Sequence, residues 1–296
     1  MNIDSFLKIG HGHEICQDYI LTGDDPCPYI IIADGCSDAK DSDIGVRILC
    51  HAALNHLKKN QSHLHFDANA LGQDIIKEAV ITKSYFNTKI DCLDATLIIA
   101  YKFNGFYRIY MFGDGIFQWT NKDGYRHFNR IYYKPNAPAY LRYRVNGYEN
   151  YRKAHVAGFY QTKRRDVVFA EGPMEPFHQI IDADCVQSLF VASDGIESFQ
   201  YKEELMYKTR FINLQNGINK APGDMKIEEL KNGYYGATFA YPSEIGFEEV
   251  IKEMTDFKLT SGPFLQRRVK KVMKNYLKRG IINDDDLSIG CFYEDK

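Results

Sequence analysis

The chain has 296 residues, and its net charge is close to zero because 37 basic side chains balance 39 acidic ones. A chain of this length can bury a substantial core, and its even charge balance excludes the strong overall field that draws proteins to nucleic acid. The seven cysteines form no C-x-x-C pair and are odd in number. They argue against a zinc ribbon and a disulfide framework, and they predict a reducing, cytoplasmic setting.

The hydropathy pattern predicts neither a signal peptide nor a membrane span, so no membrane partner is expected. The N-terminus has no apolar core region, and nowhere do about 18 uncharged apolar residues follow one another. No linker rich in Pro, Gly or Ser divides the chain, which predicts a single domain over residues 1–296. The stretches 120–185 and 203–262 are rich in Tyr and basic residues and are expected to form inserted loops or a flap.

Apolar spacing and end signals predict three helices. Ser42 is the expected N-cap of the first, which runs to about Lys59, and a second amphipathic helix is expected near residues 68–84. The third lies within 263–279, and Gly280 directly follows its expected end. Its inward face is predicted to consist of Leu265, Val269, Val272 and Tyr276.

Short strands are predicted between the second and third helices and after the third. Residues 95–103 and 106–112 flank an Asn104-Gly105 pair, which is typical of a hairpin turn. Further strands are expected at 115–119, 125–129, 154–160, 166–170, 188–193 and 286–293. Helices, then antiparallel strands, then helices and a closing strand predict an α+β fold with helices on the outer faces of its sheets.

Three apolar runs end in an Asp-Gly pair, at Asp34, Asp114 and Asp194. A turn is the ordinary explanation of such a pair, because Gly accepts positive φ and Asp bonds to nearby backbone. Asp114 fits a hairpin, since a strand pattern follows it. Asp34 and Asp194 do not, because stretches with helical patterns follow them, the second within residues 196–205.

Carboxylates that end buried strands and come together create a dense negative charge, which requires a cation between them. Mg²⁺ and Mn²⁺ prefer oxygen ligands, and a neighbouring Gly lets a backbone carbonyl approach the ion. The sequence offers two further sources of carboxylates, Asp18 and the run 284–286. Such a run is ordinarily a solvated loop, but here a strand pattern follows it directly.

Six short motifs follow one another in the chain: CQD, IIIADG, DATLII, FGDG, LFVASDGIESF and DDDLS. In this order and spacing they resemble the type 2C metal-dependent protein phosphatases, particularly their bacterial branch. The matches extend from about Gly12 to Ile289. The resemblance implies a β-sandwich of two mainly antiparallel sheets flanked by helices, in α-β-β-α layers, with a metal cluster at one end.

The resemblance also implies roles for individual residues. Asp34 corresponds to the carboxylate that bridges two metal ions, and the Gly35 carbonyl to a ligand of one of them. Asp194 and Asp285 correspond to ligands of the first metal, and Asp18 to an acidic residue on the side of the second. Asp34 and Asp194 are therefore the expected catalytic residues.

Asp114 resembles the position that helps to hold a third, weaker metal in bacterial members, and the hairpin turn remains an equally good explanation of it. The implied reaction is hydrolysis of phosphoserine or phosphothreonine in a protein substrate by a hydroxide between two Mn²⁺ or Mg²⁺ ions. A cognate serine/threonine kinase is an implied partner, no nucleic-acid partner is expected, and the protein is expected to be a monomer.

Two positions depart from the family pattern. His13 stands where many members carry a phosphate-binding Arg, and Cys36 stands where many carry a His that protonates the leaving group. His13 is the candidate phosphate-binding residue, although a His offers fewer donors than the fixed fork of an Arg, and an ordinary surface His remains the alternative. A thiol is a poor substitute for the missing His.

Two other functions remain open. The departures at His13 and Cys36 favour a weakly active or inactive phosphatase-like module that binds phosphoproteins or senses a ligand. A two-metal phosphodiesterase uses the same ion chemistry, and a Tyr-rich and Arg-rich stretch at 125–153 has the composition of a single-strand binding track. A flap that grips a phosphoprotein explains that composition equally well.

Overall fold

The structure is a computed structural model of the chain. It describes residues 1–134, 138–145, 156–161, 166–170, 176–212, 226–230 and 234–294. Of these, residues 134, 156–161, 166–170, 203–212, 226–230 and 234–243 are described by their backbone alone.

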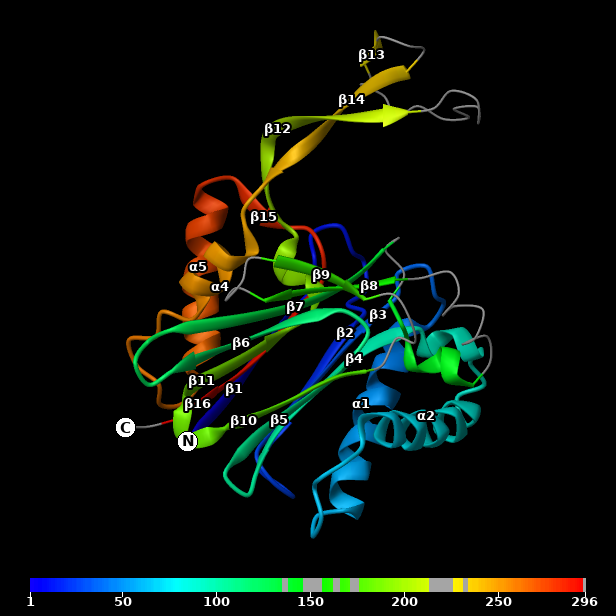
Figure 1. Cartoon of the computed structure of the whole chain (residues 1–296), viewed down its shortest axis with the longest axis vertical. Coiled ribbons are helices and arrows are strands. Elements are labelled where there is room, and N and C mark those ends of the chain that lie inside the picture. Colours follow the sequence, from blue (N-terminus) through cyan, green and yellow to red (C-terminus); the bar gives the residue numbers. More distant parts are fainter. Residues whose placement is uncertain are drawn as a thin grey trace.

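Two antiparallel sheets form the centre of the molecule (Figure 1). The first has seven strands, in the spatial order β1 (Asn2–Lys8), β16 (Leu287–Tyr293), β11 (Val186–Ala192), β6 (Gly115–Asn121), β7 (Arg126–Lys134), β8 (Val156–Gln161) and β9 (Asp166–Ala170). The second has five, in the order β10 (Phe177–Asp182), β5 (Phe106–Phe112), β4 (Ala95–Phe103), β3 (Tyr29–Gly35) and β2 (Asp18–Gly23).

Side chains between the two sheets form a central core, to which Ile30 and Ile32 of β3 and Phe117 of β6 belong. The intervening residues of β3, Ile31 and Ala33, point to the opposite face and join a second core beneath the helices. Strand β3 is therefore buried on both faces, which explains its uninterrupted apolar run.

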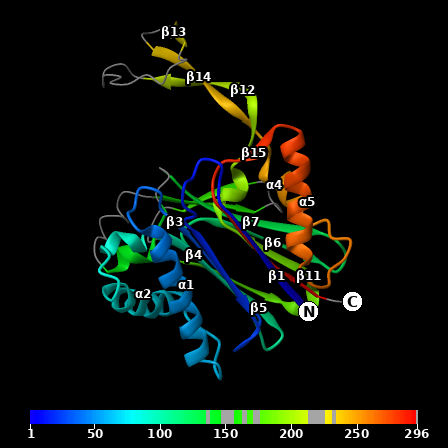
Figure 2. The ribbon, with the colours of Figure 1, turned by 180° about the vertical axis from the view of Figure 1, so that it is seen from behind.

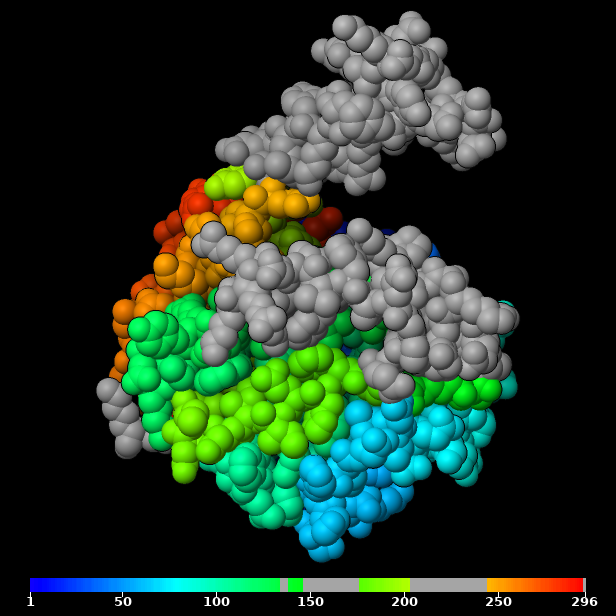
Figure 3. Space-filling model, viewed as in Figure 1, coloured from blue at the N-terminus to red at the C-terminus, as the bar shows by residue number. Residues whose placement is uncertain are grey.

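Helices cover the outer faces, as Figures 1 and 2 show from opposite sides. Helices α1 (Ser42–Lys59) and α2 (Ala68–Ser84) pack on the five-stranded sheet, and α4 (Phe247–Met254) and α5 (Phe264–Lys278) share a core with the seven-stranded sheet. Figure 3 shows the two groups at opposite sides of the molecule, blue to cyan and orange to red. The predicted α+β sandwich with α-β-β-α layers is confirmed.

The three predicted helices are present, with one difference at an end. Asp41, at φ 59°, is the N-cap of α1, and Ser42 is its first helical residue. In α5, the predicted inward face is buried: Leu265, Val269, Val272 and Tyr276. No helix in the described part of the chain is long and apolar enough to cross a membrane.

The prediction of a helix after Asp194 was wrong. Residues Asp194–Glu197 form one short turn, η4, and strand β12 (Phe199–Ile212) follows. Phe199 pairs with Asn283 of β15 (Ile281–Asn283), and its ring is buried against Tyr276. Tertiary pairing therefore overrides the local helical pattern.

Strand β12 also begins a third sheet, which extends beyond the sandwich in Figure 1. Its order is β13 (Lys226–Leu230), β14 (Tyr234–Glu244), β12 and β15. This sheet and α4 occupy most of what is described of 203–262, and β7 to β10 occupy most of what is described of 120–185. Parts of both stretches lie outside the described residues, and their function as a flap stays a prediction.

The prediction that Asp114 lies in a hairpin turn was also wrong. Strand β5 before it belongs to the five-stranded sheet, and β6 after it belongs to the seven-stranded sheet. The segment therefore crosses from one sheet to the other. Gly113 (φ 95°) and Gly115 (φ 138°) adopt backbone conformations that L side chains rarely adopt, which permits this crossing.

The described part of the chain also contains the short turns η1 (Ile90–Leu93), η2 (Leu141–Arg144) and η3 (Ala183–Cys185).

Candidate metal centre

A polar cavity of about 320 Å³ lies where segments from both sheets end. We call it the acidic cavity. The candidate residues that line it are His13, Asp34, Gly35, Asp114, Asp194 and Asp285. They come from five segments of the chain: the β1–β2 loop, the end of β3, the β5–β6 crossing, turn η4 and the β15–β16 loop. Six of the seven candidate site residues thus meet at one place.

Asp18, the seventh, lies behind the cavity wall. It begins β2 directly opposite Asp34 of β3, whose other neighbour in the sheet is Thr96 of β4. Only 1% of Asp18 is exposed. Its Oδ2 accepts a hydrogen bond of 2.7 Å from the Ser193 hydroxyl, whereas its buried Oδ1 has no partner.

Turn η4 and the β15–β16 loop are fixed to each other. A Cβ on Gly195 would lie 1.7 Å from the carbonyl oxygen of Asp286, so only glycine permits this approach. The Ser198 hydroxyl accepts a hydrogen bond of 3.1 Å from the N–H of Asp285. These contacts hold Asp194 and Asp285 on neighbouring walls of the acidic cavity.

The carboxylates of this region destabilise one another in their charged form. Burial raises the pKa of Asp18 to about 7, and the nearby Asp194 adds to this effect. Burial and then Asp18 and Asp194 raise the pKa of Asp34 well above its usual range, and burial and Asp194 do the same for Asp114. The pKa of Asp285 is raised by the same causes. A bound cation would remove this repulsion.

The donor set fits a hard divalent cation. Carboxylate oxygens and the backbone carbonyl of Gly35 are the ligands that Mg²⁺ and Mn²⁺ prefer, and the buried Oδ1 of Asp18 lacks a partner. Within the described ranges, no three His, Cys, Asp or Glu side chains form a ready-made cluster of metal ligands. The structure therefore gathers the candidate ligands around one cavity without bringing three of these side chains into a cluster, within the described residues.

A family model described as Protein phosphatase 2C matches residues 10–230. The chain belongs to this family. Members of the protein phosphatase 2C family depend on divalent metal ions, which agrees with the oxygen donors of the acidic cavity. No curated protein matches the sequence.

Solved structures of bacterial phosphatases share the fold. A bacterial serine phosphatase is 13% identical with a TM-score of 0.53, and the match covers 100% of this chain and 99% of that one. Stp1 from Staphylococcus aureus is 11% identical with a TM-score of 0.51, over 99% of this chain and 95% of that one. PstP/Ppp of Mycobacterium tuberculosis is 11% identical with a TM-score of 0.50, over 99% of both chains. At these identities the likeness is one of fold.

In this member of the 2C family, His13 faces carboxylates. Its Nε2 lies 3.4 Å from Asp285 Oδ1, and its Nδ1 lies 3.1 Å from Asp286 Oδ2. Burial alone would lower the pKa of His13, but Asp286 and Asp285 outweigh it and raise the pKa. The two carboxylates thus favour the protonated imidazole at the edge of the acidic cavity, and its contact with phosphate stays a prediction.

Sequence reasoning missed the function of Asp286. Only 2% of this residue is exposed, and its carboxylate accepts hydrogen bonds from the N–H groups of Gly10 (2.8 Å) and Gln17 (2.5 Å). It thereby ties the β1–β2 loop, which carries His13, to the β15–β16 loop. The three consecutive Asp residues differ: Asp284 is exposed, Asp285 lines the acidic cavity and Asp286 is a buried anchor.

Tyr140 is the second residue that the sequence did not reveal. It lines the acidic cavity together with Cys36 and is 8% exposed. Burial, and after it the neighbouring Cys36 and Asp114, raise the pKa of Tyr140, so its hydroxyl keeps its proton. Its stretch lies between two strands and carries no motif that predicts this position.

Glu197 and Arg130 form an ion pair beside the acidic cavity. Burial raises the pKa of Glu197 to about 7 even though Arg130 opposes the shift. The Arg130 guanidinium also lies 4.9 Å from the ring centre of Tyr132 and 5.4 Å from that of Phe247. Glu197 belongs to turn η4, which places its carboxylate against Arg130.

Proposed function

We propose that the protein is a phosphatase that hydrolyses phosphoserine and phosphothreonine esters in proteins with two divalent ions. One observation carries the proposal: Asp34, Asp114, Asp194 and Asp285, from four separate segments, are four of the five carboxylates that line one cavity in a chain of the 2C family. Among the described lining residues, His13 alone supplies a basic side chain.

We assign the ions to these side chains. Asp34, the Gly35 carbonyl, Asp18, Asp194 and Asp285 would hold the two ions. Asp114 is assigned to a third and weaker ion. Bound divalent ions lower the pKa of water and offset the negative charge of a phosphoryl group.

The leaving group requires a proton-bearing partner, because Cys36 replaces the His that many family members carry. Tyr140 supports this role, since its buried hydroxyl keeps its proton and lies beside Cys36. In the proposed reaction this hydroxyl donates a hydrogen bond to the ester oxygen of the substrate. His13, held by Asp285 and Asp286, places positive charge where phosphate oxygens enter.

The test compares two neighbouring carboxylates. Phosphate release from a phosphothreonine peptide is measured with Mn²⁺, with Mg²⁺ and with a chelator. Asp285→Asn is expected to lower kcat/KM by about a hundredfold or more, because it removes a proposed ligand. The matched control Asp284→Asn alters the adjacent exposed residue and is expected to stay within about threefold, as surface changes usually do.

Full activity in the chelator, or equal activity of the two Asn variants, would contradict the proposal. The same samples separate the other two functions. Saturable Mn²⁺ binding in calorimetry without turnover of any phosphopeptide indicates a binding module. Cleavage of a single-stranded oligonucleotide in preference to the phosphopeptide indicates a phosphodiesterase.

A further inference from the structure

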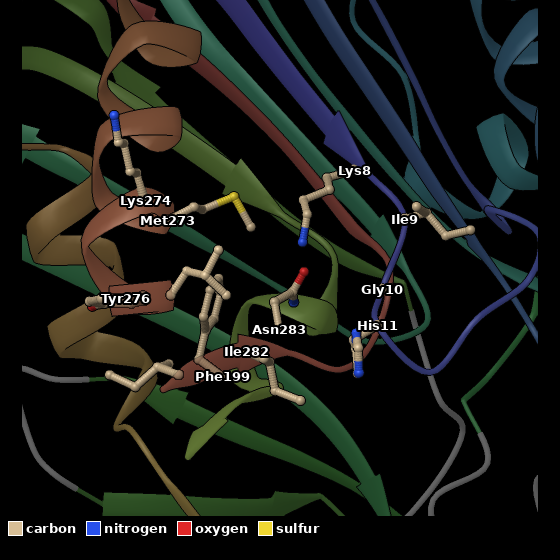
Figure 4. Close-up of a pocket in the computed structure, with 12 residues that line it drawn as sticks. Lys8, Ile9, Gly10, His11, Phe199, Met273, Lys274, Tyr276, Ile282 and Asn283 are labelled. Atoms are coloured by element: carbon tan, nitrogen blue, oxygen red, sulfur yellow. The ribbon is translucent and has the colours of Figure 1, made fainter. Parts of the chain in front are cut away.

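A second cavity, of about 490 Å³, lies between the end of β1, helix α5 and strand β15 (Figure 4). We call it the Lys8 cavity. Its walls are largely apolar and include Phe199, Met273, Tyr276 and Ile282. None of its described lining residues is acidic, and Lys8 and Lys274 are both among them. A volume of this size accommodates a small organic molecule.

A buried polar atom without a partner points into this cavity. Asn283 is 2% exposed, and its side-chain nitrogen donates hydrogen bonds to the Gly195 carbonyl (3.1 Å) and the Ser198 hydroxyl (2.8 Å). Because a carbonyl only accepts, the nitrogen must face Gly195, which turns Oδ1 away from it. This oxygen has no partner, and Figure 4 shows it directed toward Lys8.

The ammonium group at the other side of the cavity also lacks a counter-charge. Figure 4 shows the Lys8 side chain pointing into the cavity. Lys8 is exposed as a whole and has no ion pair in the described part of the chain, and partial desolvation of its ammonium group lowers its pKa. The cavity thus offers an apolar wall, a positive group, and a buried acceptor that requires a donor.

We propose that the Lys8 cavity binds a small amphipathic anion, with its acidic group on Lys8, a hydrogen-bond donor on Asn283 Oδ1, and its apolar body against Met273 and Phe199. A hydroxylated or amino-substituted aromatic or acyl acid has this combination. A simple fatty acid lacks the donor, and a neutral lipid lacks the charge.

The ligand would act on the acidic cavity through Asn283. The Asn283 amide and the N–H of Asp285 both bond to the Ser198 hydroxyl, and the Asn283 amide also bonds to the carbonyl next to Asp194. An anion that bonds to Oδ1 would shift the Asn283 amide. This amide bonds to the segment that carries Asp194 and shares the Ser198 hydroxyl with Asp285, and both aspartates are proposed metal-binding residues. Binding of the ligand and of Mn²⁺ are therefore coupled, and by linkage the coupling is reciprocal. This second step rests on the proposed function, whereas binding itself does not.

The first experiment measures binding in a chelator, so that it is independent of the metal. The probe is 2-anilinonaphthalene-6-sulfonate, which has an aromatic body, an anionic group and a free N–H donor. Its fluorescence is titrated with the full chain, and one saturable site is expected. Decanoate and 3-hydroxydecanoate then compete with it, and the hydroxylated acid is expected to compete about fivefold better because it supplies the donor.

Two variants test the site from the side of the protein. Lys8→Met is expected to raise the Kd of the probe about fivefold or more, because it removes the proposed counter-charge. Met273→Trp, which adds bulk at the wall, is expected to abolish saturable binding. The control Lys270→Met removes an exposed lysine of α5 that does not line the cavity, and its Kd is expected to stay within about twofold.

The proposal is overturned if the wild type shows no saturable site, if Lys8→Met and Lys270→Met bind equally well, or if the two acids compete equally. Ordered water alone in the cavity would give the first result. The coupling is tested by repeating the titration at saturating Mn²⁺, where the Kd is expected to change about fivefold or more in either direction. An unchanged Kd overturns the coupling and leaves the binding site standing.

Discussion

The acidic cavity and the Lys8 cavity lie on two sides of the same loop, and their electrostatics are opposite. The first gathers Asp34, Asp114, Asp194 and Asp285, and burial raises the pKa of three of them. The second contains Lys8 and Lys274 and no acidic lining residue among those described. The charges of the first cavity therefore favour a cation, and those of the second favour an anion.

The loop that separates the cavities shows how this contrast arises. Successive residues point in different directions: Asn283 toward the Lys8 cavity, Asp285 toward the acidic cavity, and Asp286 into the protein. Asn283 and Asp285 share the Ser198 hydroxyl as a hydrogen-bond partner. A few residues of backbone thus serve two chemically distinct sites.

The largest expected effect is a loss of hydrolysis in Asp34→Asn that leaves binding in the Lys8 cavity unchanged. Asp34→Asn is expected to lower kcat/KM for the phosphothreonine peptide by about a thousandfold, because it removes a carboxylate assigned to the two ions. The same variant should bind the anilinonaphthalene probe in chelator within about twofold of the wild type. Lys8→Met should instead weaken binding of the probe and leave kcat/KM for the phosphothreonine peptide close to that of the wild type. Parallel loss of hydrolysis and of probe binding in either variant would mean that the cavities are one site.

A smaller effect concerns pH and the metal. Because the folded-state pKa of Asp18 is raised to about 7, the stability that its protonated form contributes is lost as pH rises from about 4 through about 7, and the raised pKa of Asp34 acts in the same direction. In chelator, the melting temperature is expected to fall by about 4 °C or more between pH 5 and pH 8. Calorimetry checks this fall, and Mn²⁺ at pH 8 should reverse it. Asp18→Asn should reduce it, and a melting temperature that rises with pH in chelator would contradict the assignment.

The smallest effect concerns Tyr140 at the edge of the acidic cavity. Tyr140→Phe is expected to lower kcat for the phosphothreonine peptide about five- to tenfold, because one hydrogen bond to the leaving group is lost. The loss should disappear with p-nitrophenyl phosphate, whose leaving group needs no such donor. Tyr143→Phe, which alters the ring stacked on Tyr140, is the control. An equal loss with both substrates would show that Tyr140 acts on folding or binding instead.

The sequence predicted the parts of the acidic cavity that end buried strands. Asp34 follows an apolar run that is buried on both faces, so both the strand and the carboxylate at its end could be recognised from the sequence. Asp194 was visible for the same reason, although β12 replaced the expected helix after it. The buried face of helix α5 was predicted correctly because its apolar residues recur with the helical period of 3.6 residues, which can be recognised from the sequence alone.

The sequence could not reveal contacts between distant residues. Nothing local distinguishes Asp286, whose partners Gly10 and Gln17 are 276 and 269 residues away. Asp114 matched a hairpin because the pattern does not state which sheet each strand joins. The unpartnered oxygen of Asn283 depends on the positions of Gly195 and Ser198, which local propensity does not encode.

Strand β1 pairs with β16 along its whole length, from Asn2 opposite Tyr293 to Lys8 opposite Leu287, and Asp286 bonds to the loop that follows β1. During synthesis, β1 therefore leaves the ribosome long before its partner β16. The β15–β16 loop arrives together with that partner, so both cavities are completed only then. A growing chain accordingly remains without a finished site until β16 has been translated.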